Sequence, residues 1–284
     1  MTGVEPDQQR AETLERWRRA AVGWGRRADT VRDFGMPVSA WLVDQLDLQP
    51  GHVVLELAAG PGDTGFMAAE LVRPGGRLIC SDNSEPMLEI ARERAAEQGI
   101  ENVEFRLLEL EWIDMGAASV DAVLCRWGLM FPPDPGAALQ DVRRVLRPGG
   151  RCALAVWDAP ELNPWATVPT RALLEAGLIE PPDPDAPGMF TLAQPGRLSG
   201  LLESAGFTEV RVESAEVVGS WPDVAGYLDQ MIDLNVSLAE SLAGLGPESQ
   251  ERLRARIEEL CAPFQDSQGA LRMPGRSIVA SASA

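Results

Sequence analysis

The sequence predicts an α/β protein built on a mostly parallel sheet with helices on both faces. An apolar segment rich in β-forming residues, 53–58, stops at a glycine turn and passes into a helical pattern. A second apolar segment, 77–82, follows and ends on the acid Asp82. The alternation of strand and helix continues to residue 157, which is the pattern of parallel strands joined by helical crossovers.

Local signals place each element of this series. Strands are expected at 53–58, 77–82, 103–108, 120–126 and 151–157. Helices are expected at 64–72, at 135–146 and at 85–98, where Gly99 marks the end. The phrase Arg-Pro-Gly-Gly-Arg occurs at 73–77 and again at 147–151. Each copy is expected to close a helix and start a strand, on the edge opposite the ligand groups.

Outside this core the pattern is helical or irregular. Residues 6–32 form a charged helical segment, and 37–48 is amphipathic with Pro37 at its start, as helix beginnings favour. The expected order after 157 is a proline-rich stretch at 158–195 with an irregular loop at 181–187, a short helix at 195–205, a strand at 207–215, helices over 222–264 and an antiparallel strand at 270–281.

These elements suggest a core with added helical parts. The expected parts are an N-terminal helical segment, 1–36, a cofactor-binding core, 37–157, insertions at 158–206 and 222–264, and late strands at 207–221 and 270–281. Because the insertions lie between late strands, we expect them to fold with the N-terminal helices as a lid over the ligand.

The ligand groups are expected at the carboxyl ends of the first two strands, where open α/β sheets bind ligands. The spacing Gly60-x-Gly62-x-x-Gly65 fits a dinucleotide fingerprint. Pro61 and Asp63 argue against a pyrophosphate, because Pro61 has no N–H and the Asp63 carboxylate would cap the helix amides and repel phosphate. S-adenosylmethionine, which has no phosphate and carries a sulfonium, fits better.

Four motifs in this order, at 55–62, 81–87, 120–128 and 143–150, resemble a known family. Over residues 35–157 the chain is similar to class I S-adenosylmethionine-dependent methyltransferases of the small-molecule type, such as ubiquinone/menaquinone biosynthesis methyltransferases. The resemblance implies a Rossmann-like sheet of seven strands, methyl transfer as the activity and S-adenosylmethionine as the cofactor.

The resemblance also implies roles at the methionine and ribose ends of the cofactor. Glu56 and Gly60 would line the methionine end, and Gly62 would let the chain pass close to the cofactor. Asp82 would accept hydrogen bonds from both ribose hydroxyls. Arg126 would lie near the carboxylate and amine of the methionine.

At the adenine end the resemblance implies that Met87 packs on the ring, that Glu109 faces the amino group and that Leu110 presents its backbone N–H. Asn83 is expected among the cofactor-binding residues. The chain departs from the family where Ala58 replaces the first glycine of the turn, and where the run ending at Glu109 replaces a glycine–acid pair.

Aromatic residues outside the motifs favour a flat, apolar acceptor. The candidates for its pocket are Trp24, Trp127, Trp165, Met189, Phe190, Trp221 and Tyr227. His52, the only histidine, precedes the first strand at the far end of the sheet and is not expected to be a base. A carboxylate or Tyr227, the only tyrosine, remains as a candidate base, as does an acceptor that loses its proton readily.

Composition limits the partners. With 25 basic and 43 acidic residues the net charge is −18, which disfavours nucleic acid and anionic membranes. The first residues are too charged for a signal peptide, and no apolar run approaches the ~20 residues of a membrane span. The spacing of the four cysteines fits no zinc motif, and we expect them to be buried thiols. We therefore expect a cytoplasmic enzyme of secondary metabolism that holds no metal. A homodimer is a possible assembly.

Three other functions stay open at this point. The same fold could serve a cyclase or isomerase that keeps the cofactor without transferring its methyl group. The glycine spacing alone would also fit an NAD-dependent oxidoreductase. A binding module without activity has the least support, because a complete cofactor crevice is expected.

Overall fold

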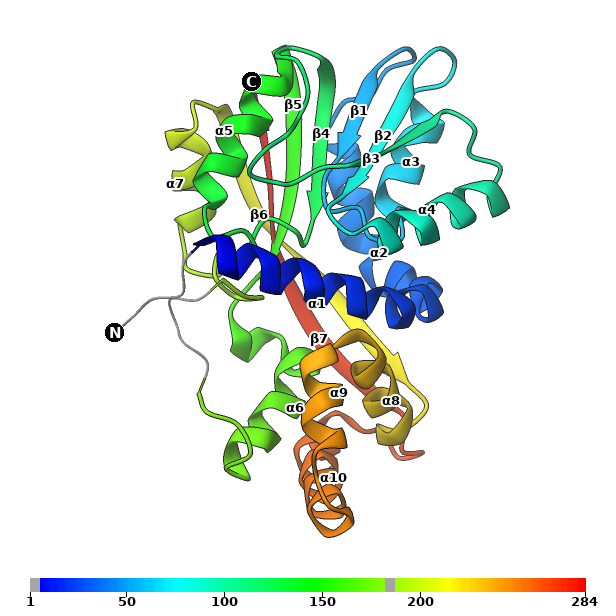
Figure 1. The fold of residues 1–284 in the computed structure, drawn as a ribbon, viewed down its shortest axis with the longest axis vertical. Coiled ribbons are helices and arrows are strands. Elements are labelled where there is room, and N and C mark those ends of the chain that lie inside the picture. Colours follow the sequence, from blue (N-terminus) through cyan, green and yellow to red (C-terminus); the bar gives the residue numbers. More distant parts are fainter. Residues whose placement is uncertain (1–5, 182–186) are drawn as a thin grey trace.

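A computed structural model describes residues 6–181 and 187–284 of the chain. Its centre is a seven-stranded sheet in the order β3-β2-β1-β4-β5-β7-β6 (Figure 1). Strands β1 to β5 pair in parallel, and β7 pairs antiparallel with both β5 and β6. The strands are β1 Val53–Glu56, β2 Arg77–Asp82, β3 Val103–Leu107, β4 Val120–Arg126, β5 Leu146–Trp157, β6 Thr208–Trp221 and β7 Leu271–Ser283. The predicted fold class and the antiparallel late strand are confirmed.

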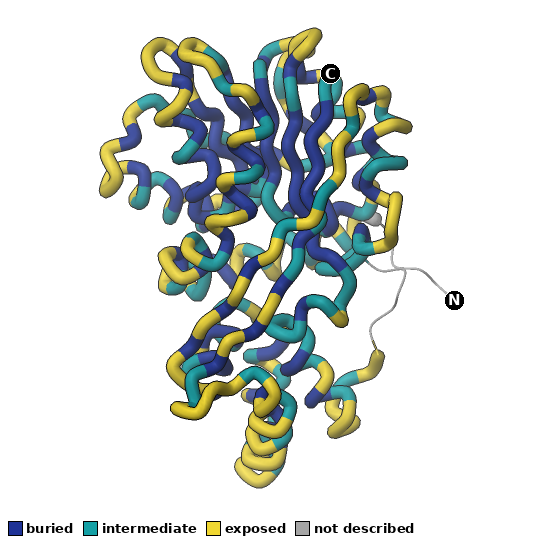
Figure 2. The backbone as a smooth tube through the Cα atoms, turned by 180° about the vertical axis from the view of Figure 1, so that it is seen from behind, coloured by how far each residue is buried: buried dark blue, intermediate teal, exposed yellow. Residues whose placement is uncertain are grey.

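The parallel strands are buried on both faces, which explains their continuous apolar sequences. Leu55 of β1 pairs with Ile79 of β2 on one side and Val123 of β4 on the other, and all three are buried. Seen from behind, the central strands are buried along most of their length (Figure 2). The flanking helices are α2 Ala28–Asp44, α3 Asp63–Leu71 and α4 Glu85–Glu97 on one face, and α5 Pro135–Val145 and α7 Arg197–Ser204 on the other.

A second core forms where β6 and β7 extend past β5 as a two-stranded ribbon, in the lower half of Figure 1. Apolar side chains from the ribbon and from the helices around it make this core, among them Trp221, Leu253, Ile257 and Met273. These helices are η1 Pro160–Leu162, α6 Pro164–Glu175, α8 Val224–Leu234, α9 Val236–Ala243, α10 Pro247–Cys261 and η2 Ala262–Phe264.

The predicted helix start at Pro37 is wrong. Helix α2 begins at Ala28 and continues through Pro37 without a break. Its buried stripe, which includes Val31, Val38 and Leu42, follows the helical period across the proline, while Pro37 itself lies on the exposed side. Burial of this stripe against the sheet therefore overrides the local signal that proline gives for a helix start.

The stretch at 158–195 is more regular than expected, since α6 occupies its first half with Pro164 at the start. Of the predicted loop at 181–187, residues 182–186 lie outside the described residues. Strand β6 runs to Trp221 instead of 215, because β7 supplies a pairing partner along that whole length. Strand β5 begins at Leu146, which pairs with Val120.

Helix α1, Pro6–Arg26, crosses the molecule between the sheet and the lower helices (Figure 1). It contacts α4, α8 and α9. Its end is fixed to α8, because Arg26 and Arg27 both pair with Asp233, at 2.5 and 2.6 Å. The position of α1 brings N-terminal side chains to the carboxyl ends of the parallel strands.

Candidate active site

The turn between β1 and α3 has backbone conformations that favour glycine. Gly60 and Gly62 have φ angles of 53° and 87°, and a Cβ at Gly62 would lie 2.5 Å from the Phe66 ring. Ala58 has a φ of 50°, a left-handed conformation that costs an L-residue about 1–2 kcal/mol. Gly128 makes room for it, because a Cβ at 128 would lie 2.5 Å from that of Ala58. A glycine on the neighbouring loop thus accommodates the departure at position 58.

Asp82, the last residue of β2, ties this turn to the start of α4. Its carboxylate accepts hydrogen bonds from the backbone N–H groups of Gly60 and Ser84, both at 2.9 Å. Burial raises the pKa of Asp82 to about 6, against the lowering effect of these N–H groups. Each carboxylate oxygen can accept further hydrogen bonds, and the side chain lines a cavity. Asp82 is therefore placed to accept hydrogen bonds from a bound diol.

Glu56 and Arg126 carry unpartnered polar atoms at the same cavity. Glu56 Oε1 accepts the Gly65 N–H at 2.9 Å, while its Oε2 is buried and has no partner among the described residues. Burial raises the pKa of Glu56 to about 8, and the charge of Arg126 opposes this shift. Arg126 Nη1 is also buried without a described partner, and the guanidinium lies 4.7 Å from the Trp127 ring centroid. A carboxyl group and a guanidinium without partners could bind the two charged groups of a zwitterion, its ammonium and its carboxylate.

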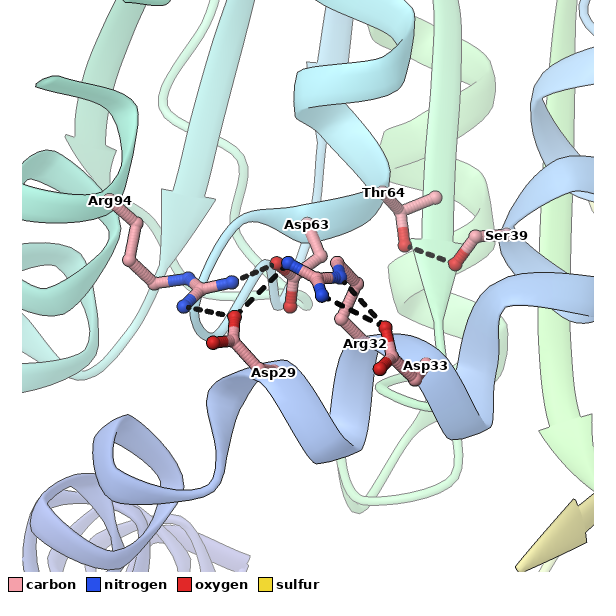
Figure 3. Close-up of polar contacts among 7 residues, drawn as sticks. All are labelled: Asp29, Arg32, Asp33, Ser39, Asp63, Thr64 and Arg94. Atoms are coloured by element: carbon pink, nitrogen blue, oxygen red, sulfur yellow. Dashed lines mark hydrogen bonds and ion pairs between the residues drawn. The ribbon is translucent and has the colours of Figure 1, made fainter. Parts of the chain in front are cut away.

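Three helices are joined at the N-terminus of α3 (Figure 3). Arg94 of α4 donates to Asp63 of α3 at 2.7 Å and to Asp29 of α2 at 3.2 Å. Beside this cluster, the hydroxyls of Ser39 and Thr64 lie 2.9 Å apart. The expected cap by Asp63 is wrong, because the N-cap of α3 is glycine and makes no side-chain cap. The Asp63 carboxylate instead balances the charge of Arg94.

The first cavity lies at the carboxyl ends of β1, β2 and β4. The predicted cofactor residues that line it are Glu56, Gly60, Asp82, Asn83, Met87, Glu109, Leu110 and Arg126. Gly62 is not among the lining residues; it is the N-cap residue of α3. The Asn83 side chain donates to Glu109 at 3.2 Å, which links the predicted adenine and ribose ends.

Residues of α1 complete this cavity, and apart from Trp24 no local sequence signal marks them. Arg10, Thr13 and Trp17 line it together with Trp24. Two hydrogen bonds from Arg10 to Glu111, at 2.9 and 3.0 Å, hold α1 against the segment after β3. These contacts join segments that are far apart in the sequence, so no spacing rule could indicate them.

A second cavity of about 650 Å³ adjoins the first. The two share Trp17, Trp24, Trp127 and Phe131. Most of the other walls of the second cavity are apolar or aromatic, and they include Phe34, Met130, Trp157, Trp165, Met189, Trp221 and Met231. The structure therefore brings Trp24, Trp127, Trp165 and Trp221 to one cavity, as the sequence analysis expected.

Trp127 stands at the junction of the two cavities. Its φ of 60° is rare for a bulky side chain and costs on the order of 1–3 kcal/mol. Two contacts hold it there: its indole stacks on Trp157 with centroids 4.2 Å apart, and its N–H donates to Ser277 at 2.9 Å. Strain retained in this way is typical of functional positions.

Phe190 and Tyr227 do not line the second cavity, in contrast to the prediction from the sequence. The neighbouring Met189 takes the wall position expected for Phe190. Tyr227 is fully buried in the second core, and its hydroxyl donates to the backbone oxygen of Trp165 at 2.7 Å. Burial raises the pKa of Tyr227 well above its ordinary value, which also argues against a role as base.

Replacing Tyr227 by phenylalanine should therefore affect stability and not catalysis. Loss of one buried hydrogen bond is expected to cost about 1 kcal/mol and to lower the melting temperature by about 2–4 °C. Turnover, measured at a temperature where both proteins are folded, should stay near that of the unchanged enzyme. A variant that is as stable as the parent but has lost most of its turnover would restore Tyr227 as a candidate base.

His52 and the four cysteines lie where the sequence predicts them. His52 lies just before β1, at the far end of the strands, and its ring accepts the Gln49 N–H at 3.2 Å. All four cysteines are buried free thiols. Within 6–181 and 187–284, no group of acidic, histidine or cysteine side chains is arranged to hold a metal ion. None of the helices in these ranges has the length and apolar character to cross a bilayer.

Comparison with known proteins gives the family. A model described as a methyltransferase domain matches residues 48–175. Nocamycin O-methyltransferase of Saccharothrix syringae is 32% identical over 207 residues, which are 66% of this chain and 74% of that protein. The chain belongs to the class I S-adenosylmethionine-dependent methyltransferases of small molecules. S-adenosylmethionine is accordingly the cofactor of this methyltransferase.

The matches to other relatives span less of those proteins' length. Arsenite methyltransferase of Halobacterium salinarum is 33% identical over 64% of this chain and 45% of that protein. The ubiquinone/menaquinone biosynthesis C-methyltransferase of Pasteurella multocida is 32% identical over 44% and 47%. These matches favour methyl transfer over the oxidoreductase and cyclase hypotheses.

Solved structures confirm the fold of this methyltransferase. The YcgJ protein of Bacillus subtilis has a TM-score of 0.56 at 18% identity and covers 86% of this chain and 97% of its own. The [4+2]-cyclase SpnF reaches a TM-score of 0.52 at 16% identity, over 86% and 79% of the two chains. At such identities the likeness shows the shared fold alone.

Proposed function

We propose that this methyltransferase binds S-adenosylmethionine in the first cavity and methylates a flat, apolar acceptor in the second. The observation that carries the proposal is the junction at Trp24 and Trp127, which line both cavities. A donor in one cavity and an acceptor in the other would meet there. The aromatic walls and the size of the second cavity suit a natural-product or quinone-like compound.

The residues of the first cavity fit the cofactor. The buried Glu56 Oε2 and Arg126 Nη1, which have no described partners, would pair with the ammonium and carboxylate of the methionine end. Asp82 would accept hydrogen bonds from the ribose hydroxyls. Met87, which is 2% exposed, would pack on the adenine. Gly60 would line the methionine end, and Gly62 would keep the turn close.

The rim of the cavity would recognise the adenine edge. Glu109, which accepts a hydrogen bond from Asn83, would face the adenine amino group, and Leu110 would present its backbone N–H to the ring. Both residues line the cavity beside Asn83. The hydrogen bond between Asn83 and Glu109 would hold the carboxylate in place for this contact.

Alignment is the main contribution that we assign to the protein. When bound, the cofactor supplies an electrophilic methyl group on a sulfonium. The two adjoining cavities would hold donor and acceptor in line, and such orientation can contribute about 7–11 kcal/mol of the barrier. The aromatic side chains around the junction would exclude water. We assign no side chain as the catalytic base.

The helices around the second cavity would act as a lid. Residues of α1, α2, α8 and α9 line it together, and the ion pairs of Asp233 join the end of α1 to α8. The relative named for nocamycin supports a role in secondary metabolism. The four buried free thiols support a location in the reducing cytoplasm.

The function is tested by incubating the enzyme with S-adenosylmethionine and a panel of flat phenolic, quinone and polyketide compounds. The expected product is heavier than its acceptor by one methylene unit, and S-adenosylhomocysteine forms in equal amount. An acceptor converted to an isomer of unchanged mass, with no S-adenosylhomocysteine formed, would support the cyclase or isomerase hypothesis and contradict this proposal.

Replacing Trp165 by leucine should weaken acceptor binding and leave the cofactor site intact. Trp165 lines the second cavity and not the first. Loss of aromatic contact area is expected to raise the KM for an apolar acceptor by roughly tenfold, at about 25 cal/mol per Å² of apolar surface. The dissociation constant of S-adenosylhomocysteine, measured by calorimetry, should not change. Equal weakening of both ligands would contradict the separation of the two cavities.

A further inference from the structure

We propose that Gly35 of α2 is a positioning residue for the methionine end of the cofactor, because its missing side chain leaves the space that the Arg126 guanidinium occupies. This inference rests on the proposed role of Arg126 in binding the methionine carboxylate. Gly35 lies outside the four sequence motifs, in a helix that belongs to another part of the chain.

The contact between α2 and Arg126 is very close. A Cβ built on Gly35 would lie 1.8 Å from Arg126 Nη1 and 3.0 Å from Arg126 Cζ. The same Cβ would lie 3.1 Å from Cη2 of Trp127. Even one methyl group at position 35 would therefore force the guanidinium to move. Because the colliding atoms are the far end of a flexible side chain, the helix itself can remain in place.

Arg126 has little freedom to move within the site. On one side its guanidinium lies over the Trp127 indole, 4.7 Å from the ring centroid. The indole is itself held by its stack on Trp157 and its hydrogen bond to Ser277. The same guanidinium lies against the backbone of α2 at Gly35. An indole and a helix backbone therefore both confine it, and a side chain at 35 would take part of the space that it occupies.

The charges around Arg126 show why its position matters. Burial lowers the pKa of Arg126, and the charges of Glu56 and Asp63 partly offset this effect. Its Nη1 nevertheless has no hydrogen-bond partner among the described residues. A buried donor without a partner is costly, so a ligand that accepts from it gains affinity only if the guanidinium stays where it is.

Helix propensity alone would favour alanine at this position. Glycine in a helix interior is less favourable than alanine, and Gly35 lies in the middle of α2 on its buried stripe. Val38, Leu42 and Val43 of this stripe instead pack in the hydrophobic core of the sheet. The glycine at 35 is thus explained by the space that it leaves for Arg126 and Trp127, and not by the needs of the helix.

Replacing Gly35 by alanine tests the inference with two ligands. S-adenosylhomocysteine carries the amino-acid end, and 5′-methylthioadenosine lacks it. We expect G35A to weaken S-adenosylhomocysteine by roughly tenfold to a hundredfold, the effect of a lost charged hydrogen bond, and to leave 5′-methylthioadenosine within about twofold. Gly200→Ala in α7 is the matched control, since a Cβ there meets no atom within 4 Å. Equal weakening of both ligands by G35A would overturn the proposal.

A double-mutant cycle with Arg126→Ala tests the proposed role of Arg126 separately from the inference about Gly35. R126A should weaken S-adenosylhomocysteine about as much as G35A does, and G35A added to R126A should have no further effect. If R126A leaves the affinity unchanged, the proposed role of Arg126 fails. If R126A weakens binding and G35A does not, the inference about Gly35 fails on its own.

The same variants also test the inference if G35A does not fold. Should G35A alone not fold, the double variant G35A/R126A is expected to fold, because the guanidinium that the new methyl group would meet is absent. Thermal melting of both variants gives this comparison. A double variant that also fails to fold would overturn the proposal, since the collision would then involve groups other than Arg126.

Discussion

Replacing Asp82 by alanine is expected to weaken S-adenosylhomocysteine binding by roughly a hundredfold or more. Two ribose hydroxyls would lose a charged acceptor, and each such hydrogen bond contributes about 1.5–3 kcal/mol. The same carboxylate accepts the backbone N–H groups of Gly60 and Ser84 at 2.9 Å, so its loss also releases the turn after β1. Calorimetric titration of the purified variant measures the effect.

Two further variants serve as comparisons for this result. Asp82→Asn keeps an acceptor oxygen of similar shape but not the charge, and it should lose less affinity than alanine does. His52→Ala should bind the cofactor and turn over as the parent does, because His52 lies at the other end of the strands. Unchanged affinity in D82A would remove the ribose role, and with it the cofactor site at the end of β2.

The cofactor half of the site could be predicted because its signals are local. The bend after β1 needs glycines at Gly60 and Gly62, where φ is positive, and the sequence supplies them. The acid at the end of β2 follows from parallel pairing, which aligns the carboxyl ends of neighbouring strands. A single βαβ unit therefore contains most of what the cofactor requires.

The second cavity, which we propose as the acceptor site, could be predicted only in its chemical character. The aromatic character of this cavity is predictable, but Phe190 packs against the core of the sheet and Tyr227 lies in the second core, so neither lines the cavity. Nothing near Tyr227 in the sequence indicates that its hydroxyl meets the backbone of Trp165, 62 positions away. Which aromatic side chains face a cavity and which fill a core is decided by contacts between distant segments.

Helices α2 and α3 show the same limit. The Asp63 prediction applied a rule for helix ends that holds without neighbours, but Arg94 of another helix takes that carboxylate. The proline rule failed at Pro37, where a buried stripe continues through it. The contact of Gly35 with Arg126 joins residues 91 positions apart and follows from no periodicity. In each case tertiary packing overrides a local preference.

The pH dependence of cofactor binding should depend on Glu56. Burial raises the pKa of its carboxyl to about 8 in the cofactor-free enzyme, so the group is mostly protonated at neutral pH. The ammonium of the methionine end favours the ionised form, so binding should release a proton. As pH rises toward 8, less work is needed to ionise Glu56, and the affinity for S-adenosylhomocysteine should rise by up to about tenfold per unit.

Above about pH 8 the affinity should level off, because Glu56 is then already ionised in the cofactor-free enzyme. Titrations in buffers of different ionisation enthalpy would count the protons released. Glu56→Gln should abolish the rise between pH 6 and 8, and so should 5′-methylthioadenosine, which has no ammonium. Both should keep a weaker dependence near pH 6, where Asp82 has its pKa of about 6. The same steep rise in E56Q would show that another group binds the methionine end.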